Sequence, residues 1–282
     1  MKVYMFPGQG SQHRGMGEKL FERFTREVEE ASHLLGEDIK DLCLYDTMGK
    51  LNQTQFTQPC LYLVNCLSYL ALREDKGELP DYLCGHSLGE YSALFAADVF
   101  DLYAGFEIVK KRGELMADIR EGGLVAILGN DVDQAMMLLK EEDLSRIDLA
   151  NFNTPEQIVI GGVKKDLDLA TALLEKKGFR CVQLNVSGAF HTHYMESARH
   201  KFMKFLTNYT FKEPTIPVLC SSFSHLFKEK YAIETLGFQI TRSVNWVECI
   251  QKLGTLGAKT FTEVGPGEVL TRMTDKIISY DA

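Results

Sequence analysis

The chain has 282 residues, of which 45% are hydrophobic and 25% are charged. This composition is typical of a globular protein that can form one large domain, or a large domain with a small one. The formal net charge of −8 argues against nucleic acid as a partner. We see neither a signal-peptide pattern at the N-terminus nor an apolar run long enough to span a bilayer, so we expect a cytoplasmic protein that binds no membrane.

The cysteines give no sign of a metal site. There are seven of them, scattered along the chain, and none has a C-x-x-C or other metal-ligand spacing. An odd number of scattered cysteines is typical of reduced thiols in a protein core. The chain also lacks the glycine-rich fingerprint of a dinucleotide site. We therefore expect neither a metal nor a bound cofactor.

The chain begins with an apolar run at residues 3–6, which predicts a strand, and residues 7–12 then form a tight loop. Glycines on both sides of Gln9 would let its backbone approach a ligand closely. A plain turn explains the same residues equally well. Apolar spacing predicts helices over residues 18–35 and 57–72, the second with a proline in its first turn.

Residues 82–90 carry the pattern G-x-S-x-G around Ser87. An apolar strand at 82–84 precedes it and a run of helix formers at 88–97 follows it, which is the context of a nucleophile elbow. Such a turn exposes the serine hydroxyl and points the first amides of the helix toward it, where they can stabilise an oxyanion. The alternative interpretation of the same five residues is a simple Gly-Ser turn at the end of a strand.

The next predicted helix, at residues 102–119, carries an arginine on its apolar face. Arg112 is flanked at helical spacing by apolar neighbours, namely Ile108, Val109, Leu115 and Met116. A buried guanidinium is costly unless it is paired. An internal ion pair or a side chain that reaches out to solvent would explain it. The alternative is a cation that binds the carboxylate of a ligand.

After Gly122 and Gly123 the pattern changes to β-α-β-β-α-β. The predicted strands are residues 124–128, 147–150, 158–160 and 181–186, and the helices are 132–140 and 167–176. This order predicts a ferredoxin-like subdomain at residues 123–186. It would be inserted into a large α/β-hydrolase-like subdomain made of residues 1–122 and 187–282.

A loop at residues 187–192 follows the insertion and precedes a predicted helix at 195–206. His191 lies in this loop, where a catalytic base could be held between rigid elements. His193 is its main rival. The remaining prediction is a strand at 216–220, a largely helical stretch at 236–253, a strand at 260–264 and a helix at 269–278. Alternating strands and helices predict a mostly parallel sheet covered on both faces.

Six segments occur in the order that one family shows. They are FPGQGSQ at 6–12, GHSLGE at 85–90, KRG at 111–113 with Met116, NTP at 153–155, GAFH at 188–191 and EVGPG at 263–267. Together they resemble malonyl-CoA:acyl-carrier-protein transacylase over nearly the whole chain. The GAFH form on a single domain resembles the free-standing acyltransferases that serve modular polyketide synthases in trans.

The resemblance implies a role for each matching residue. Ser87 is the nucleophile that accepts the acyl group, and His191 is its general base. Arg112 binds the free carboxylate of malonate. The backbone amides of Gln9 and Leu88 form the oxyanion hole.

Other implied roles concern the surroundings of the base. Gln239 matches the position whose backbone carbonyl orients His191, in place of the aspartate of a triad. Asn153 lines the cleft between the subdomains. Phe190 fills the space that a methyl group on the malonyl C2 would need, which favours unbranched malonyl. One departure from the family is the pair of serines at 221–222, where many relatives carry asparagine, and it affects either the support of His191 or the acyl pocket.

The implied activity is ping-pong transfer of malonyl from malonyl-CoA to the phosphopantetheine thiol of an acyl carrier protein, or of a carrier domain in a synthase, for polyketide or fatty acid synthesis. The phosphopantetheine belongs to the partner, so the enzyme itself needs no cofactor, and we expect a monomer. One alternative is an acyl-carrier-protein thioester hydrolase of the same fold, against which Arg112 argues. Another is a non-catalytic docking scaffold.

Overall fold

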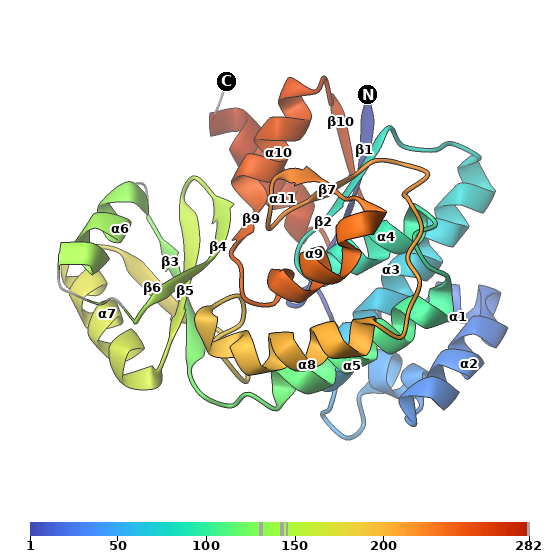
Figure 1. The fold of residues 1–282 in the computed structure, drawn as a ribbon, viewed down its shortest axis with the longest axis horizontal. Coiled ribbons are helices and arrows are strands. Elements are labelled where there is room, and N and C mark those ends of the chain that lie inside the picture. Colours follow the sequence, from blue (N-terminus) through green and yellow to red (C-terminus); the bar gives the residue numbers. More distant parts are fainter. Residues whose placement is uncertain (130–131, 142–143, 145, 281–282) are drawn as a thin grey trace.

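The computed structural model describes residues 1–129, 132–141, 144 and 146–280, and it contains two five-stranded sheets (Figure 1). The first sheet has the order β10-β1-β2-β7-β8. Its strands are β1 (Lys2–Phe6), β2 (Tyr82–Gly85), β7 (Val218–Cys220), β8 (His225–Leu226) and β10 (Thr260–Glu263). All neighbouring strands are parallel except β7 and β8.

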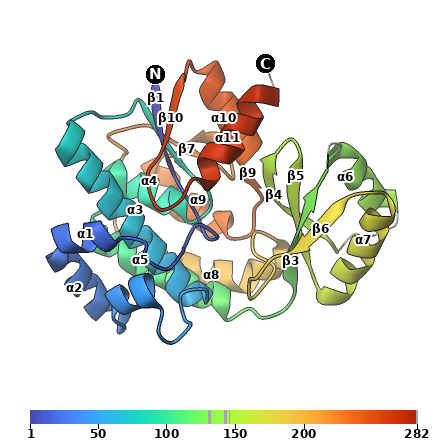
Figure 2. The same cartoon turned by 180° about the vertical axis from the view of Figure 1, so that it is seen from behind.

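Both faces of the first sheet are covered, which explains why β1 is apolar at successive positions. Tyr4 and Phe6 belong to the main core with residues of α3 (Thr54–Lys76), α4 (Gly89–Ala96), α5 (Leu102–Ala117) and α8 (Glu196–Leu206). Val3 and Met5 point to the other face and pack with α10 (Trp246–Thr255) and α11 (Val269–Tyr280). Figure 2 shows these last two helices beside β10 and β1.

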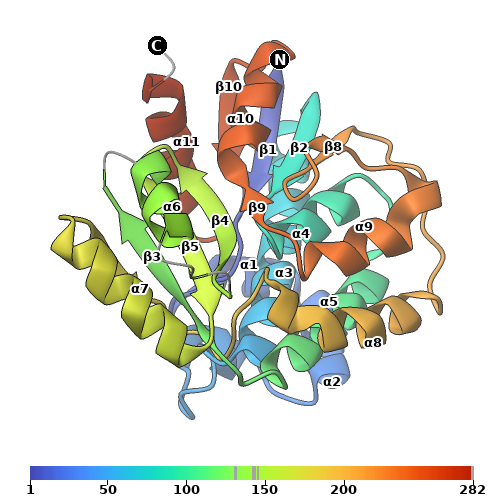
Figure 3. The same ribbon diagram turned by 60° about the vertical axis from the view of Figure 1, so that its left-hand side comes forward.

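The second sheet has the order β6-β3-β5-β4-β9. Its strands are β3 (Gly123–Leu128), β4 (Asp148–Thr154), β5 (Gln157–Gly162), β6 (Arg180–Gln183) and β9 (Val244–Asn245). The first four are antiparallel neighbours in the ferredoxin-like order, and α6 (Val132–Glu141) and α7 (Lys164–Lys176) pack on one face around a separate apolar core. Figure 3 brings this subdomain forward.

The predicted fold class is confirmed, with a large α/β-hydrolase-like part and a small ferredoxin-like one. Where one part ends and the other begins, at residues 122–123 and 186–187, stays a prediction. β9 lies far outside the predicted insertion, yet it pairs in parallel with β4 of the small sheet. The remaining elements are α1 (Glu18–Arg23), α2 (Thr25–Leu35), α9 (Ala232–Gln239), a π-helical turn (Asp41–Tyr45) and two 3-10 turns (His193–Met195 and Glu229–Tyr231).

Three predicted elements were wrong in detail. The helix expected at 18–35 is two helices, because Phe24 leaves the helical region with φ −115° and ψ 48° and buries its ring in the core. Pro59 lies inside α3, which begins at Thr54, and not in a first turn. The stretch at 236–253 contains β9, because Val244 pairs with Asn151 of β4 and tertiary pairing overrides local helical preference.

Several predicted boundaries also shift by a few residues. β4 extends to Thr154, and β6 ends at Gln183, before the predicted end at residue 186. No helix in the described part of the chain is both long and apolar enough to cross a membrane.

Candidate active site

The site forms where β1 and β2 end side by side. Because the two strands are parallel, the loop after Phe6 and the elbow after Gly85 leave the same edge of the sheet. The nucleophile position itself is strained, since Ser87 has a φ of 51° in the left-handed region. A Cβ on Gly89 would lie 1.9 Å from the carbonyl oxygen of Phe6, so the elbow can approach β1 only if this residue is glycine.

His191 meets Ser87 directly. The Ser87 Oγ lies 2.7 Å from His191 Nε2. On the other side of the ring, Nδ1 lies 2.9 Å from the carbonyl oxygen of Gln239 and 3.1 Å from that of Arg242. Carbonyl oxygens only accept, so Nδ1 carries the proton and Nε2 is left to accept the proton of the serine.

Burial keeps His191 in its neutral form. Burial and the positive charge of Arg112 lower the pKa of His191 from 6.5 to about 3, although the two backbone carbonyls favour the cation. At neutral pH the imidazole is therefore unprotonated and can act as a base. The rival, His193, bonds to Asp148 at 2.8 Å and is half exposed, outside this arrangement.

Arg112 is fully buried beside the nucleophile. Its guanidinium donates to the side-chain oxygen of Gln58 at 2.7 Å, to that of Gln239 at 3.0 Å and to Ser87 Oγ at 3.1 Å. Within the described ranges, its Nε has no hydrogen-bond partner and no carboxylate lies at ion-pair distance. The internal ion pair considered from the sequence is therefore not formed among these residues.

Gln9 and Leu88 lie in the loops that follow the neighbouring strands β1 and β2. Leu88 precedes α4, and Gln9 lies in the loop after β1 with its side chain bonded to Thr54 at 3.2 Å. In the part of the chain that the structure describes, neither backbone amide donates a hydrogen bond. Both amides are thus available to an oxyanion, and this role stays a prediction.

Asn153 and Phe190 lie next to catalytic segments. The Asn153 side-chain oxygen bonds to His86 Nε2 at 2.9 Å, so the small sheet is tied to the elbow. Phe190, the neighbour of His191, is buried in the main core. The substrate-binding roles inferred for these two residues stay predictions.

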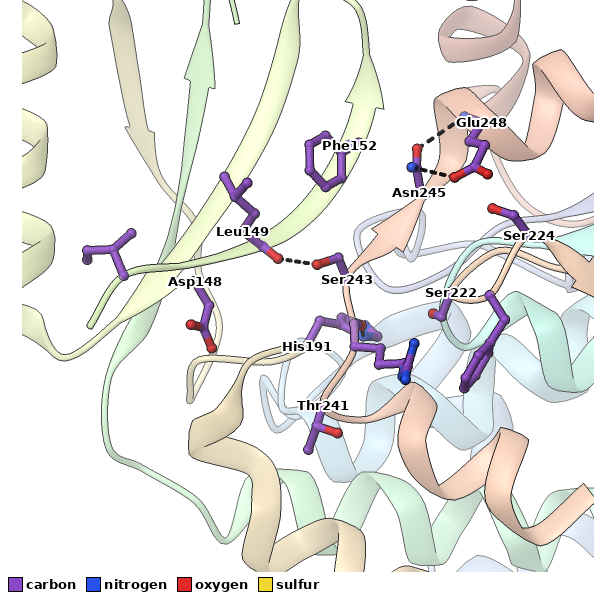
Figure 4. Close-up of a pocket in the computed structure, with 13 residues that line it drawn as sticks. Asp148, Leu149, Phe152, His191, Ser222, Ser224, Thr241, Ser243, Asn245 and Glu248 are labelled. Carbon is purple, nitrogen blue, oxygen red and sulfur yellow. Dashed lines mark hydrogen bonds between the residues drawn. The ribbon is translucent and has the colours of Figure 1, made fainter. Parts of the chain in front are cut away.

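A cleft of about 620 Å³ opens beside the base, between the two subdomains (Figure 4). His191, Ser222 and Thr241 line it from the large part. Asp148, Leu149 and Phe152 of the β4 strand line it from the small part. Figure 4 shows the Ser243 hydroxyl bonded to the Leu149 carbonyl across this gap.

Two contributors to the site were missed by the sequence analysis. Gln58 holds Arg112, and Glu90 is fully buried on α4 with its carboxylate bonded to Ser221. Burial raises the pKa of Glu90 from 4.5 to about 7. A charged residue within the apolar run 88–97 was the signal that could have revealed Glu90. Ser221, one of the two serines that depart from the family pattern, therefore contacts Glu90, while Ser222 lines the cleft.

Residues 3–279 match the family model described as an acyl transferase domain. The chain belongs to this family. It is 46% identical over 279 residues to the polyketide biosynthesis malonyl CoA-acyl carrier protein transacylase PksC of Bacillus subtilis, covering 98% of this chain and 97% of that protein. It is 44% identical over 281 residues to BaeC of Bacillus velezensis, which carries the same description, covering 98% and 96%.

Solved structures agree with this assignment. The malonyl CoA-acyl carrier protein transacylase from Burkholderia pseudomallei superposes with a TM-score of 0.95 at 42% identity, covering 99% of this chain and 98% of that one. A malonyl-transacylase in complex with its type II polyketide synthase acyl carrier protein superposes with a TM-score of 0.93 at 32% identity, covering 99% and 93%. The family resemblance inferred from the six segments is confirmed, and the protein is an acyltransferase.

Proposed function

We propose that this protein transfers a malonyl group from malonyl-CoA to the phosphopantetheine thiol of an acyl carrier protein, through a malonyl ester on Ser87. The observation that carries this proposal is Arg112. Its buried guanidinium lies 3.1 Å from Ser87 Oγ and has only neutral oxygens as partners among the described residues. A carboxylated acyl group supplies the negative charge that this cation lacks.

The two amide oxygens that contact Arg112 leave it able to bind a carboxylate. Gln58 and Gln239 hold the guanidinium by hydrogen bonds but do not neutralise its charge. The Nε–H and the N–H that now bonds to Ser87 are then available to the malonyl carboxylate. The cation is thus held in place before the substrate arrives, which lowers the entropic cost of binding.

In the first half-reaction, His191 Nε2 takes the hydroxyl proton of Ser87 as the Oγ attacks the thioester carbonyl. The amides of Gln9 and Leu88 stabilise the negative charge on the resulting tetrahedral oxygen. When this intermediate collapses, the C–S bond breaks and the CoA sulfur leaves with the proton from His191. Malonyl is then esterified to Ser87.

In the second half-reaction, the carrier thiol attacks the malonyl ester and gives its proton to His191. The proton then returns to Ser87 as the ester bond breaks. The sequence thioester, ester, thioester needs no energy input, so the enzyme must exclude water to avoid hydrolysis. Relatives named as transacylases give no support to the hydrolase alternative.

We assign the acyl preference to two residues. Arg112 selects a free carboxylate, and Phe190 opposes a methyl branch at C2 with a discrimination of about 1–3 kcal/mol. The names of the similar proteins from the two Bacillus species favour polyketide over fatty acid synthesis. We also propose that the enzyme works as a monomer in the cytoplasm and without a cofactor of its own.

Intact-mass measurement tests the proposed function. The protein is incubated with malonyl-, methylmalonyl- or acetyl-CoA, with and without a holo acyl carrier protein. We expect a malonyl adduct that is transferred to the carrier, and a much weaker signal with the other two substrates. Ser87→Ala should form no adduct. Release of free malonate faster than formation of malonyl-carrier would instead establish a hydrolase.

A further inference from the structure

Arg242 is a cation that lines the cleft beside the catalytic base. The residue is exposed, and among the residues that the structure describes its side chain forms neither an ion pair nor a hydrogen bond. Its guanidinium carbon instead lies 4.7 Å from the centroid of the Phe223 ring and 5.9 Å from that of Phe238. Phe223 also lines the cleft, so the cation is held at the cleft wall.

A second arginine on the same aromatic ring shows what is different about Arg242. The guanidinium carbon of Arg199 lies 4.2 Å from the Phe238 centroid, and Glu196 supplies a carboxylate at 2.6 Å. Stacking occupies the flat face of a guanidinium, whereas its N–H groups point outward in the plane of the group. These N–H groups bind a carboxylate in Arg199. In Arg242 they have no acceptor within the described ranges, so they are available to an anion.

The two carboxylates that line the cleft do not neutralise Arg242. Asp148 accepts from the backbone amide of His193 at 2.7 Å and from its ring at 2.8 Å. Glu248 accepts from the side chain of Asn245 at 2.9 Å. Neither forms an ion pair with Arg242 in the part of the chain that the structure describes. Like charge opposes an anionic ligand beside either carboxylate, so the cleft favours an anion at Arg242.

The role of His191 indicates where the arm of the thioester lies. Under the proposed function, His191 gives a proton to the CoA sulfur and takes one from the carrier thiol, so both sulfur atoms must approach Nε2. The cleft adjoins His191, and its volume of about 620 Å³ is that of a ligand pocket. Ser222 lines the same cleft (Figure 4), and its buried hydroxyl has no partner among the described residues. That hydroxyl can donate to an amide carbonyl of a pantetheine arm.

The arm is long enough to reach Arg242 from the base. The Arg242 carbonyl oxygen and Ser87 Oγ contact opposite nitrogens of the His191 ring, at 3.1 Å and 2.7 Å. These two oxygens are therefore within about 8 Å of each other, and an arginine guanidinium lies at most about 8 Å from its own carbonyl oxygen. A phosphopantetheine arm spans roughly 16 Å from sulfur to phosphorus when extended. Its phosphate can thus lie at the guanidinium while its sulfur stays at the base.

We propose that Arg242 binds the phosphate at the far end of the pantetheine arm. CoA and a holo carrier protein share this phosphate, so one arginine serves both half-reactions in turn. A guanidinium binds phosphate through two parallel hydrogen bonds, and stacking on Phe223 holds it in place before the substrate arrives. This inference rests on the proposed function, because malonyl-CoA and the carrier protein are the substrates that bring the arm.

Two donors that differ only in this phosphate test the site. They are malonyl-phosphopantetheine and malonyl-pantetheine, and the readout is kcat/KM for loading of Ser87. In Arg242→Met we expect the preference for the phosphorylated donor to fall about tenfold, because a charge-assisted contact is lost. An effect on the support of His191 would slow both donors alike. An unchanged preference would therefore overturn the proposal.

Arg242→Lys keeps a positive charge but cannot bind in the bidentate manner, so its preference should fall only about threefold. A fall as large as in Arg242→Met would mean that the charge is not what binds the donor, and it would count against the site.

Two further substrates identify the source of the phosphate. Malonyl-CoA carries the other phosphates of its nucleotide, and it should respond to Arg242→Met as malonyl-phosphopantetheine does. A fall with malonyl-CoA alone would assign Arg242 to the nucleotide and refute the proposal. In the second half-reaction, malonyl-Ser87 is offered a holo carrier protein or free pantetheine. The preference for the carrier should also fall about tenfold, and no fall would refute a shared site.

Arg199→Met is the matched control. It removes an arginine that stacks on the same Phe238 ring but does not line the cleft. Its preference between the two small donors should stay within twofold of wild type. A tenfold fall in this variant would show a general effect of surface charge and would overturn the assignment to Arg242.

Equilibrium binding of phosphopantetheine and pantetheine, followed by calorimetry, separates this site from the proposed function, since neither molecule carries malonyl. We expect wild type, but not Arg242→Met, to bind phosphopantetheine about tenfold more tightly. That result supports the site even if wild type forms no malonyl adduct, an outcome that would refute the proposed function. Equal affinities in wild type would overturn the site whether or not the adduct forms.

Discussion

Among the described residues of the small subdomain, one acidic side chain is buried. It is Asp166, whose carboxylate forms an ion pair with the guanidinium of Arg146 at 3.0 Å. At the edge of the large sheet, Arg112 and Glu90 are both fully buried and neither forms an ion pair among the described residues. A buried charge without a counter-charge costs stability. Under the proposed function, the large subdomain gives up stability to hold a cation for a charged substrate, whereas the small subdomain keeps its buried charge paired.

Arg112→Met removes the unpaired cation and keeps most of its volume. Because the malonyl carboxylate loses its charged partner, we expect malonyl loading to fall about 10²- to 10³-fold. The free energy of unfolding in urea should stay level or rise by about 1–2 kcal/mol, since a buried charge is replaced by an apolar chain. Acetyl-CoA loading serves as the control and should not fall. Equal malonyl rates in variant and wild type would contradict the assignment of Arg112.

Glu90 should make the protein less stable as the pH rises. Its pKa is about 7 in the folded protein against 4.5 for an exposed glutamate, so the folded state binds the proton more tightly. The stabilisation from this proton is complete below pH 4.5 and is lost as the pH rises through 7. Between these limits the wild type should lose about 3 kcal/mol relative to Glu90→Gln. Urea unfolding of both proteins at pH 5 and pH 8 measures this difference, and parallel curves would show that Glu90 titrates normally.

His191 should remain an effective base in mildly acidic solution. A histidine with the ordinary pKa of 6.5 would lose about 30-fold of its neutral form by pH 5. Because the pKa of His191 is lowered to about 3, we expect no such loss of kcat/KM for malonyl loading between pH 8 and pH 5. The profile is measured on wild type and Glu90→Gln, since a fall shared by both reports His191. A shared inflection near pH 6.5 would mean that the base is more solvated than its contacts suggest.

Asp166→Asn tests the paired side of the comparison. Arg146 is largely exposed and returns to water when its partner is lost, so the unfolding free energy should drop by only about 1 kcal/mol. Malonyl loading should remain within twofold of wild type. A large loss of activity would mean that the small subdomain also sets the catalytic geometry.

The features that follow from local pattern were predictable from the sequence. The elbow at Ser87 and the apolar face around Arg112 each depend on spacing within one element. The acceptors of Arg112, by contrast, come from Gln58 on α3 and Gln239 on α9, which only the packing of three helices brings together. Neutral amides in separate helices carry no sequence signal for such a meeting.

Contacts between segments far apart in the sequence were also not predictable. The strand at Val244 is too short to show alternation, and it forms because β4 offers it an open edge. The run at 88–97 gave a sign of Glu90, but its hydrogen-bond partner Ser221 lies 131 residues further along the chain, so this contact could not be predicted.

The pairing of β9 with β4 has a consequence for protein engineering. Val244 pairs with Asn151 only two residues after Arg242, whose carbonyl holds the His191 ring. Residues 123–186 therefore cannot be exchanged freely between relatives, although their hydrophobic core is separate from that of the large subdomain. A chimaera that takes this segment from a relative must reproduce the register at Asn151, because a slip there would displace the carbonyl that orients the base.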